Sequence, residues 1–309
     1  MRLYVAGIKG MVGSAIASKG RSQGMDVVGK SSQDLDFTDR PAVFRDLQES
    51  NPDFLIIAAA KVGGIGANSS MPVDFLSQNL QIQTNLMDAA HVAGIRSVLF
   101  LGSSCVYPKF ASQPLSESAL LTGALEPTNE PYAIAKIAGL KLIEAYRRQY
   151  GHHWISAMPT NLYGPGDNFN QETAHVLPAL IHRFNEAKIK GSNEVAIWGD
   201  GTPLREFLHV DDLARACLLL ITSFDDAVAI NIGSGDEITI ENLAKLISRV
   251  VGFSGEITFN HSYSNGTPRK LLDSSRISKL GWKPQISLED GIALTYDWFL
   301  NQQDKRAVQ

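Results

Sequence analysis

The sequence predicts an α/β protein, built on a doubly wound parallel sheet and completed by a smaller C-terminal α/β domain. Two observations support this prediction. Over the first two-thirds of the chain, short apolar β-rich runs alternate with longer helical patterns, and a glycine-rich turn joins the first run to the first helical pattern. Continuously apolar strands separated by helices are typical of a parallel sheet covered on both faces, which is the doubly wound class.

The predicted elements alternate regularly up to Pro165. Strands are expected at residues 2–6, 26–29, 54–58, 97–101 and 154–158, and helices at residues 11–23, 40–49, 72–93 and 132–150. Beyond Pro165 the runs become shorter, but helix 211–221 and strand 229–233 look like returns to the large sheet. We therefore expect one domain over residues 1–165, with 207–233 returning to it, and a substrate-binding domain over residues 166–206 and 234–309.

Composition and charge argue against several classes of partner. The chain of 309 residues has a net charge of −4 and no basic block, so nucleic acid is not an expected partner. Its two cysteines form neither a disulfide framework nor a CxxC pair, and no metal site is expected. No apolar run reaches the roughly 18–20 residues of a membrane span, and the N-terminus does not read as a signal peptide. A soluble, cytoplasmic protein is expected.

A glycine-rich turn stands at the first strand–helix junction. The stretch RLYVAGIKGMVGSAI places Gly7, Gly10 and Gly13 in a GxxGxxG pattern. Glycine permits a tight turn and lets the backbone approach a pyrophosphate at the positive end of the helix. In this position the pattern predicts the dinucleotide-binding loop of a Rossmann fold. A glycine-rich turn without a ligand is the alternative.

The end of the second expected strand indicates which dinucleotide would bind. NAD sites usually carry an Asp or Glu there, which bonds the ribose 2′-hydroxyl, but this chain reads VVGKSS. Lys30, Ser32 and the loop residue Lys9 suit a 2′-phosphate, so NADP(H) is the predicted cofactor. Asp34 and Asp36 come later and are expected at the adenine edge. The alternative is that the two lysines are only solvated surface charges.

The stretch NEPYAIAK predicts a catalytic pair. Tyr132 and Lys136 are four residues apart and share one face of a helix. A nearby lysine ammonium favours phenolate and so lowers the pKa of a tyrosine towards neutrality, and the phenol can then exchange a proton with a carbonyl or alcohol oxygen. Ser103 or Ser104, in GSSCVYPK at a strand end, can hydrogen-bond the same oxygen. A YxxxK pattern alone more often marks a surface helix.

The Ser–Tyr–Lys set behind a GxxGxxG loop resembles the extended short-chain dehydrogenase/reductase superfamily. Six segments, in the expected order over nearly the whole chain, resemble the GDP-L-fucose synthase family within it: AAAKVGGI, LGSSCVYPK, EPTNEPYAIAKIAG, MPTNLYGPGDNF, WGDGTPLREFLHVDD and GTPRKLLD. The resemblance implies a bifunctional enzyme that converts GDP-4-keto-6-deoxy-D-mannose to GDP-L-fucose, by 3,5-epimerisation and then NADPH-dependent reduction at C4. It also implies a homodimer through the two long helices that end near Ala93 and Tyr150.

The resemblance further implies a role for the thiol of Cys105. The C3 and C5 hydrogens of a 4-keto sugar are acidic because they lie α to a carbonyl, so their inversion needs a base and an acid. A thiolate and an imidazole can do this work near pH 7, and Cys105 and His175 are implied as the base and the acid. If the stretch is extended, Cys105 and Ser103 point to one side. A cysteine at a strand end is more often a small buried hydrophobe, as we expect of Cys217.

In the implied reduction, Tyr132 gives its proton to the C4 oxygen, Ser103 orients the ketone and Lys136 also holds the nicotinamide ribose. The implied cofactor contacts are Gly7, Lys9, Gly10, Met11, Val12, Gly13, Lys30, Ser32, Asp36, Leu101, Gly102, Ser103, Ser104, Lys136, Pro159, Asn161, Leu162 and His175. The resemblance implies Arg183, Arg205, Trp198 and Asp273 as substrate contacts. Arg269 is a further candidate, since a guanidinium fork matches phosphate.

The remaining polar residues are expected to be structural. Asp211 and Asp212 are expected to cap the helix that they precede. His152 and His153 are expected at the surface, and no constellation is expected around His91.

Two other functions stay open. One is a nucleotide-sugar 4-epimerase or dehydratase that recycles tightly held NAD, against which the missing carboxylate after the second strand and the thiol of Cys105 both count. The other is a non-catalytic NADP-binding module, which would not need the Ser–Tyr–Lys set. The chain departs from the GDP-L-fucose synthases in the glycine loop, where Ile8 and Lys9 replace a His-Arg pair, and at Ser32, where an arginine is common.

Overall fold

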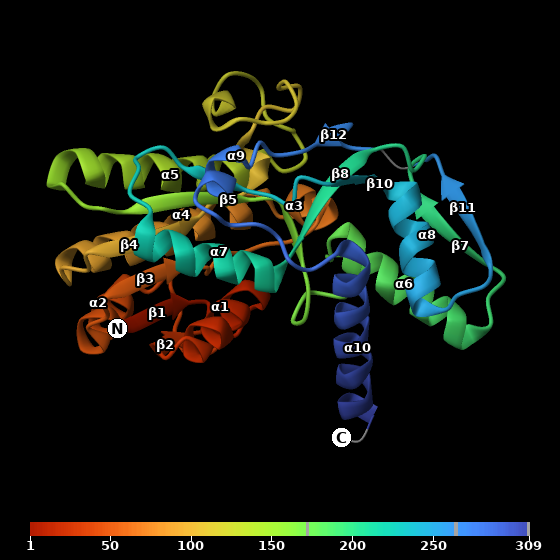
Figure 1. Cartoon of the computed structure of the whole chain (residues 1–309), viewed down its shortest axis with the longest axis horizontal. Coiled ribbons are helices and arrows are strands. Elements are labelled where there is room, and N and C mark those ends of the chain that lie inside the picture. The colour runs from red at the N-terminus through yellow and green to blue at the C-terminus, as the bar shows by residue number, and fades with distance from the viewer. Residues whose placement is uncertain (171–172, 263–264, 308–309) are drawn as a thin grey trace.

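Six parallel strands form a central sheet in the order β2–β1–β3–β4–β5–β9 (Figure 1). The computed structural model describes residues 1–170, 173–262 and 265–307. The strands are β1 (Arg2–Ala6), β2 (Asp26–Lys30), β3 (Phe54–Ile57), β4 (Ser97–Leu101), β5 (Ile155–Pro159) and β9 (Ile230–Ile232). The chain builds outward from β1 to β2 and then returns to β3 on the other side, which creates a topological switch point beside β1. The predicted doubly wound parallel sheet is confirmed.

Helices cover both faces of this sheet. Along β1, Tyr4 belongs to one hydrophobic core and Leu3 to another, as the alternation of a strand requires. The first core is covered by α2 (Arg40–Ser50), α4 (Pro72–Val92) and α5 (Glu130–Tyr150), and the second by α1 (Met11–Ser22) and α7 (Val210–Ser223). The strands are therefore apolar on both sides, which is why they read as continuous apolar runs.

A smaller α/β part lies beside the large sheet (Figure 1). Its strand β8 (Leu204–His209) pairs with β6 (Asn161–Tyr163), β10 (Glu237–Thr239) and β12 (Arg269–Lys270), while β7 (Glu194–Trp198) pairs with β11 (Glu256–Asn260). Its helices α6 (Val176–Lys190), α8 (Ile240–Val251) and α10 (Leu288–Ala307) share a third core that contains Phe184, Leu243 and Ile292. The domain boundaries given above stay a prediction.

The short helical segments α3 (Ile65–Ser70), α9 (Ser275–Lys279) and the 3₁₀ turn η2 (Glu117–Ala119) were not expected from the sequence. Helix α5 begins at Glu130, two residues earlier than expected, with Pro131 in its first turn, where a missing N–H costs nothing. In the described ranges, none of the helices is both long and apolar enough to cross a bilayer.

His91 does not stand alone, contrary to expectation. At the end of α4 its Nδ1 lies 2.8 Å from Nε2 of His152, whose ring stacks on Trp154 with centroids 4.3 Å apart. Tyr146 and Tyr150, one turn apart on α5, complete the cluster around His91. Burial and the neighbouring His91 lower the pKa of His152. The cluster therefore joins the C-terminal ends of α4 and α5.

Asp212 does not cap α7, contrary to expectation. The cap is His209, whose Nδ1 accepts the backbone N–H of Asp211 at 3.2 Å. Asp212 is fully buried, and its carboxylate accepts the backbone N–H groups of Gln285 and Ile286, each at 3.0 Å. Arg215 donates to the same carboxylate. Asp212 thus ties α7, on the large sheet, to the segment that leads into α10.

Replacing Asp212 by alanine should lower the free energy of unfolding by about 3 kcal/mol or more, because two backbone N–H groups and a guanidinium lose their buried acceptor. Urea unfolding followed by circular dichroism measures the change. Asp211→Ala is the matched control, since that side chain is 59% exposed. Equal stability of the two variants would contradict the role of Asp212.

Candidate active site

The glycine loop between β1 and α1 closes so tightly that side chains are excluded. Gly7 has a φ of +86°, and its N–H donates to the carbonyl oxygen of Lys30 at 2.8 Å. A Cβ at Gly13 would lie 2.0 Å from the carbonyl oxygen of Gly7. Gly10 precedes α1 without a side-chain cap, so the first amides of the helix keep their capacity to bind an anion. The loop therefore fits the pyrophosphate of a dinucleotide.

The groups expected around a 2′-phosphate form a network of their own. Lys9 pairs with Asp34 at 2.9 Å, and the hydroxyl of Ser31 donates to the same carboxylate at 2.6 Å. The Ser31 hydroxyl and then Lys9 hold the pKa of Asp34 well below its usual range. Lys30 lies 3.6 Å from Asp46 and is 43% exposed. Both lysines belong to the predicted 2′-phosphate site, but each already has a carboxylate partner.

Asp36 also has local partners. Its carboxylate accepts the backbone N–H and the hydroxyl of Thr38, at 2.8 and 2.7 Å. These two bonds lower the pKa of Asp36. The side chain is therefore engaged in a turn, and its contact with the adenine edge stays a prediction.

The stretch after β4 is not extended, as the sequence argument assumed. Ser103 precedes a 3₁₀ turn, η1 (Ser104–Val106), and its hydroxyl accepts the backbone N–H of Cys105 at 3.4 Å. Ser103 and Cys105 nevertheless line the same cavity. Cys105 is 7% exposed, and Cys217 is fully buried in the core of α7.

Tyr132 and Lys136 lie on one face of α5, but the expected lowering of the phenol pKa does not occur. The Lys136 ammonium donates to the carbonyl oxygen of Leu101 at 2.8 Å and lies 5.7 Å from the centre of the Tyr132 ring. Burial lowers the pKa of Lys136 to about 8. Burial, and then the charge of a Cys105 thiolate, raise the pKa of Tyr132. Loss of water outweighs the attraction of the lysine, and the phenol stays protonated at neutral pH.

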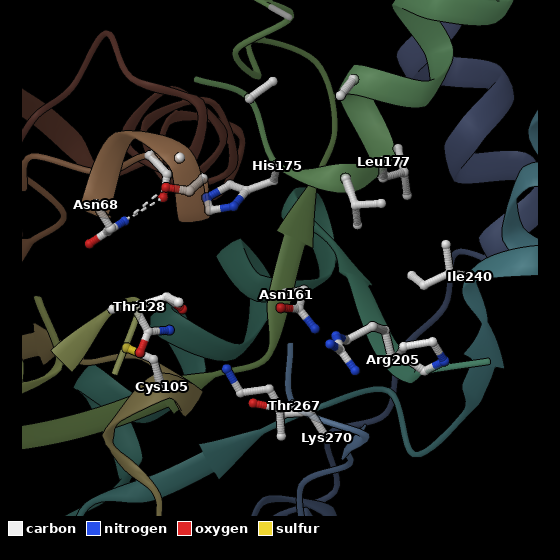
Figure 2. Close-up of a pocket in the computed structure, with 18 of the residues that line it drawn as sticks. Asn68, Cys105, Thr128, Asn161, His175, Leu177, Arg205, Ile240, Thr267 and Lys270 are labelled. Atoms are coloured by element: carbon white, nitrogen blue, oxygen red, sulfur yellow. Dashed lines mark hydrogen bonds between the residues drawn. The ribbon is translucent and has the colours of Figure 1, made fainter. Parts of the chain in front are cut away.

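One cavity of about 390 Å³ brings the candidate residues together. This cavity, the cleft, is lined by Ser103, Cys105, Tyr132, Asn161, Leu162, His175, Arg183, Trp198 and Arg205 among others. Figure 2 shows His175 and Cys105 facing the cleft from separate elements. His175 stands just before α6. The backbone N–H of Gly64 donates to the carbonyl oxygen of Thr173 at 2.9 Å, and this bond holds the segment that leads to His175.

The pKa of His175 depends on what surrounds its imidazole. The residue is exposed and lines the cleft. Loss of water within the cleft and then the positive charge of Lys270 lower the pKa of His175. The protonation of the imidazole is therefore sensitive to the charges in the cleft.

The far end of the cleft combines cations with an exposed indole. The Arg183 guanidinium lies 5.1 Å from the centre of the Trp198 ring and donates to the carbonyl oxygen of Ala196 at 2.7 Å. Trp198 is 52% exposed, so its indole is not buried in the core of the smaller part. Burial lowers the pKa of Arg205 to about 10. These groups form a cationic and aromatic wall suited to a phosphorylated nucleoside.

Comparison with known proteins places the chain in a family. The model of the NAD dependent epimerase/dehydratase family matches residues 3–233. GDP-L-fucose synthase 1 of Arabidopsis thaliana is 55% identical over 97% of this chain and 93% of its own length. GDP-L-fucose synthase of Escherichia coli K12 is 49% identical over 98% of each. This chain belongs to the GDP-L-fucose synthase family.

Solved structures agree with this assignment. A GDP-L-fucose synthetase from Naegleria fowleri bound to NADP matches with a TM-score of 0.90 and 27% identity, over 98% of this chain and 95% of its own. A GDP-mannoheptose C4 reductase from Campylobacter jejuni with NADP bound matches with a TM-score of 0.88 and 35% identity, over 97% of this chain and 98% of its own.

The structure does not bring two of the candidate substrate residues to the lining of the cleft. Arg269 pairs with Glu237 at 2.8 Å, and the Asp273 carboxylate accepts the backbone N–H of Ser275 at 3.0 Å. The lining residue from β12 is Lys270, the neighbour of Arg269. Successive strand residues face opposite sides. The stretch GTPRKLLD therefore does not show which of its two cations faces the cleft until the orientation of β12 is known. For a GDP-L-fucose synthase family member, Arg269 and Asp273 stay predictions.

Sequence reasoning also missed two polar residues in the segment just before α5. Glu126 lines the cleft and pairs with Lys109 at 2.8 Å. Asn129 lines it too, and its side-chain oxygen is buried without a hydrogen-bond donor among the described residues. The stretch EPTNEP carried both residues, but no spacing in it indicates which side chains turn inward.

Lys30→Glu should weaken NADPH binding by about tenfold or more, because a charge-assisted bond to the 2′-phosphate is replaced by repulsion. NADH binding should change little, since it has a hydroxyl there. Fluorescence titration of both nucleotides measures this ratio. Lys19→Glu, in the last turn of α1 and away from the glycine loop, is the matched control. Equal weakening of both nucleotides would reject the proposed phosphate site.

Proposed function

We propose that this protein is a GDP-L-fucose synthase that converts GDP-4-keto-6-deoxy-D-mannose to GDP-L-fucose with NADPH. One observation carries the proposal: a thiol, an imidazole, a serine and a tyrosine, Cys105, His175, Ser103 and Tyr132, line one cleft. Relatives of that name at 55% and 49% identity support it along nearly the whole chain. A reductase that does not epimerise needs only the last two groups.

The epimerisation uses two groups that line the cleft from separate elements, Cys105 and His175. The Cys105 thiolate removes a proton at C3 or C5: the C–H bond breaks, an S–H bond forms, and the electron pair passes to the C4 carbonyl as an enolate. His175, on the other wall (Figure 2), delivers a proton to the opposite face of the same carbon. Since the groups lie on separate elements, removal and return from two faces are possible.

The reduction uses the groups at the sheet edge. NADPH, when bound, supplies the hydride for C4. The Tyr132 phenol, whose raised pKa keeps it protonated, donates its proton to the C4 oxygen, and Ser103 hydrogen-bonds that oxygen. The Lys136 ammonium donates to the carbonyl oxygen of Leu101 at 2.8 Å and holds the nicotinamide ribose of the cofactor. The glycine loop and Lys30 bind the phosphates of the dinucleotide.

The proposal includes a homodimer formed through α4 and α5. These helices pack against each other, and their outer faces carry exposed apolar side chains: Val73, Val92, Ile134 and Tyr150 are 74%, 57%, 43% and 51% exposed. A second copy would cover them.

The activity is tested with purified protein, GDP-4-keto-6-deoxy-D-mannose and NADPH. We expect loss of nicotinamide absorbance and GDP-L-fucose as the product, identified by chromatography and NMR. Oxidation that yields an unepimerised 6-deoxy sugar would remove the roles of Cys105 and His175. No oxidation, with cofactor bound, would favour the NAD-recycling epimerases instead.

Two substitutions should separate the two reactions. Cys105→Ser should slow deuterium uptake from D₂O at C3 and C5 by about 100-fold or more, because a serine hydroxyl is a far weaker base, and should leave NADPH binding unchanged. Tyr132→Phe should abolish NADPH oxidation but permit the exchange. Proton NMR of the sugar reports both reactions. Unchanged exchange in Cys105→Ser would return that residue to a structural role.

A further inference from the structure

Lys270 is a cation of the cleft that the proposed mechanism does not use. It lies on β12, which pairs in parallel with β8 so that Lys270 stands opposite Arg205. Its neighbour Arg269 turns to Glu237 on the other face. Figure 2 shows the Lys270 side chain reaching into the cleft on the side of Cys105, and both residues line the cleft and the small adjoining cavity.

The carboxylate that lines these cavities with Lys270 is engaged elsewhere. Glu126 lines the same two cavities, but Lys109 pairs with it at 2.8 Å and Thr128 donates to it. Among the described residues, the Lys270 ammonium has no ion pair or hydrogen bond. It therefore keeps its charge available to an anion inside the cleft.

Three groups interact electrostatically with the side chain of Cys105: Tyr132 and Lys136 from α5, and Lys270 from β12. Tyr132 is neutral, and Lys136 is fixed on the Leu101 carbonyl. Burial lowers the pKa of Lys270, and a Cys105 thiolate opposes that shift. The same ammonium lowers the pKa of His175, so its charge reaches both walls of the cleft.

We propose that Lys270 is a positioning residue for the epimerisation, whose ammonium stabilises the thiolate of Cys105. The inference rests on the proposed function, because only the epimerisation uses a thiolate. A thiolate removed from water is costly unless a cation stands near it. β12 supplies that cation from the smaller part of the molecule, while the thiol belongs to the large sheet. The base is therefore assembled from both parts.

The test is the pH dependence of Cys105 alkylation by iodoacetamide, measured on the full chain without sugar, with the modified cysteine identified by mass spectrometry. Lys270→Met should move the pH of half-maximal alkylation up by about one unit and slow the reaction at pH 7 about tenfold, the scale of one nearby charge. Lys270→Arg should restore most of the rate. Lys61→Met is the control, because Lys61 pairs with Asp74 at 2.8 Å outside the lining of the cleft.

Superimposed profiles of Lys270→Met and the unaltered protein would overturn the proposal, as would an equal loss in Lys61→Met or no rescue by arginine. Lys270→Gln repeats the test if methionine disturbs folding, which circular dichroism reports. Deuterium uptake at C3 and C5 should then fall in parallel with alkylation. Because alkylation needs no sugar, a failure of the proposed function, seen as no turnover by the unaltered protein, is distinguished from a failure of the role of Lys270.

Discussion

The shared direction of the parallel strands is the constraint on which the site depends. β1, β4 and β5 all end at one edge of the sheet, so the glycine loop, the Ser103 turn and the start of β6 leave the sheet side by side. The backbone bond from Gly102 to the carbonyl oxygen of Ala157 at 2.8 Å keeps the ends of β4 and β5 together beyond the last paired residues. Lys136 then fixes α5 to the same edge through Leu101. The candidate catalytic groups meet because the sheet cannot place its strand ends elsewhere.

Loss of water shifts the pKa of the titratable groups in and around the cleft. It lowers the pKa of Lys136 and Arg205 to about 8 and about 10 and raises the pKa of Tyr132. A buried cation without a carboxylate is unfavourable until an anion arrives, and Lys270 is in the same position. The cleft therefore holds unsatisfied positive charge that a diphosphate, or a thiolate formed at Cys105, would relieve.

The sequence predicted what local chemistry dictates and missed what tertiary packing decides. Three features depend on sequence spacing alone, and the structure shows them. They are the positions of the strands along the chain, the glycine loop, and the placement of Tyr132 and Lys136 on one helix face. The direction in which the pKa of Tyr132 shifts depends on how much water the folded cleft excludes, and sequence spacing does not reveal this. The sequence argument named Arg269 and missed Lys270, because the pairing of the two-residue strand β12 with β8 decides which of its side chains faces the cleft. His91 and His152 meet only because α4 and α5 end together.

A buried carboxylate explains how the smaller part holds its cations in the cleft. Glu206, on β8, is fully buried, and its carboxylate accepts the backbone N–H groups of Gly235 at 2.8 Å and Leu272 at 3.1 Å. Its carbonyl oxygen accepts the side chain of Asn161 at 2.7 Å, at the exit from the large sheet. Burial raises the pKa of Glu206 and its backbone donors oppose that shift, so the carboxylate is held by peptide dipoles and not by a lysine or arginine. Because successive residues of β8 face opposite sides, Arg205 and Phe207 line the cleft while Glu206 takes its backbone donors on the other side.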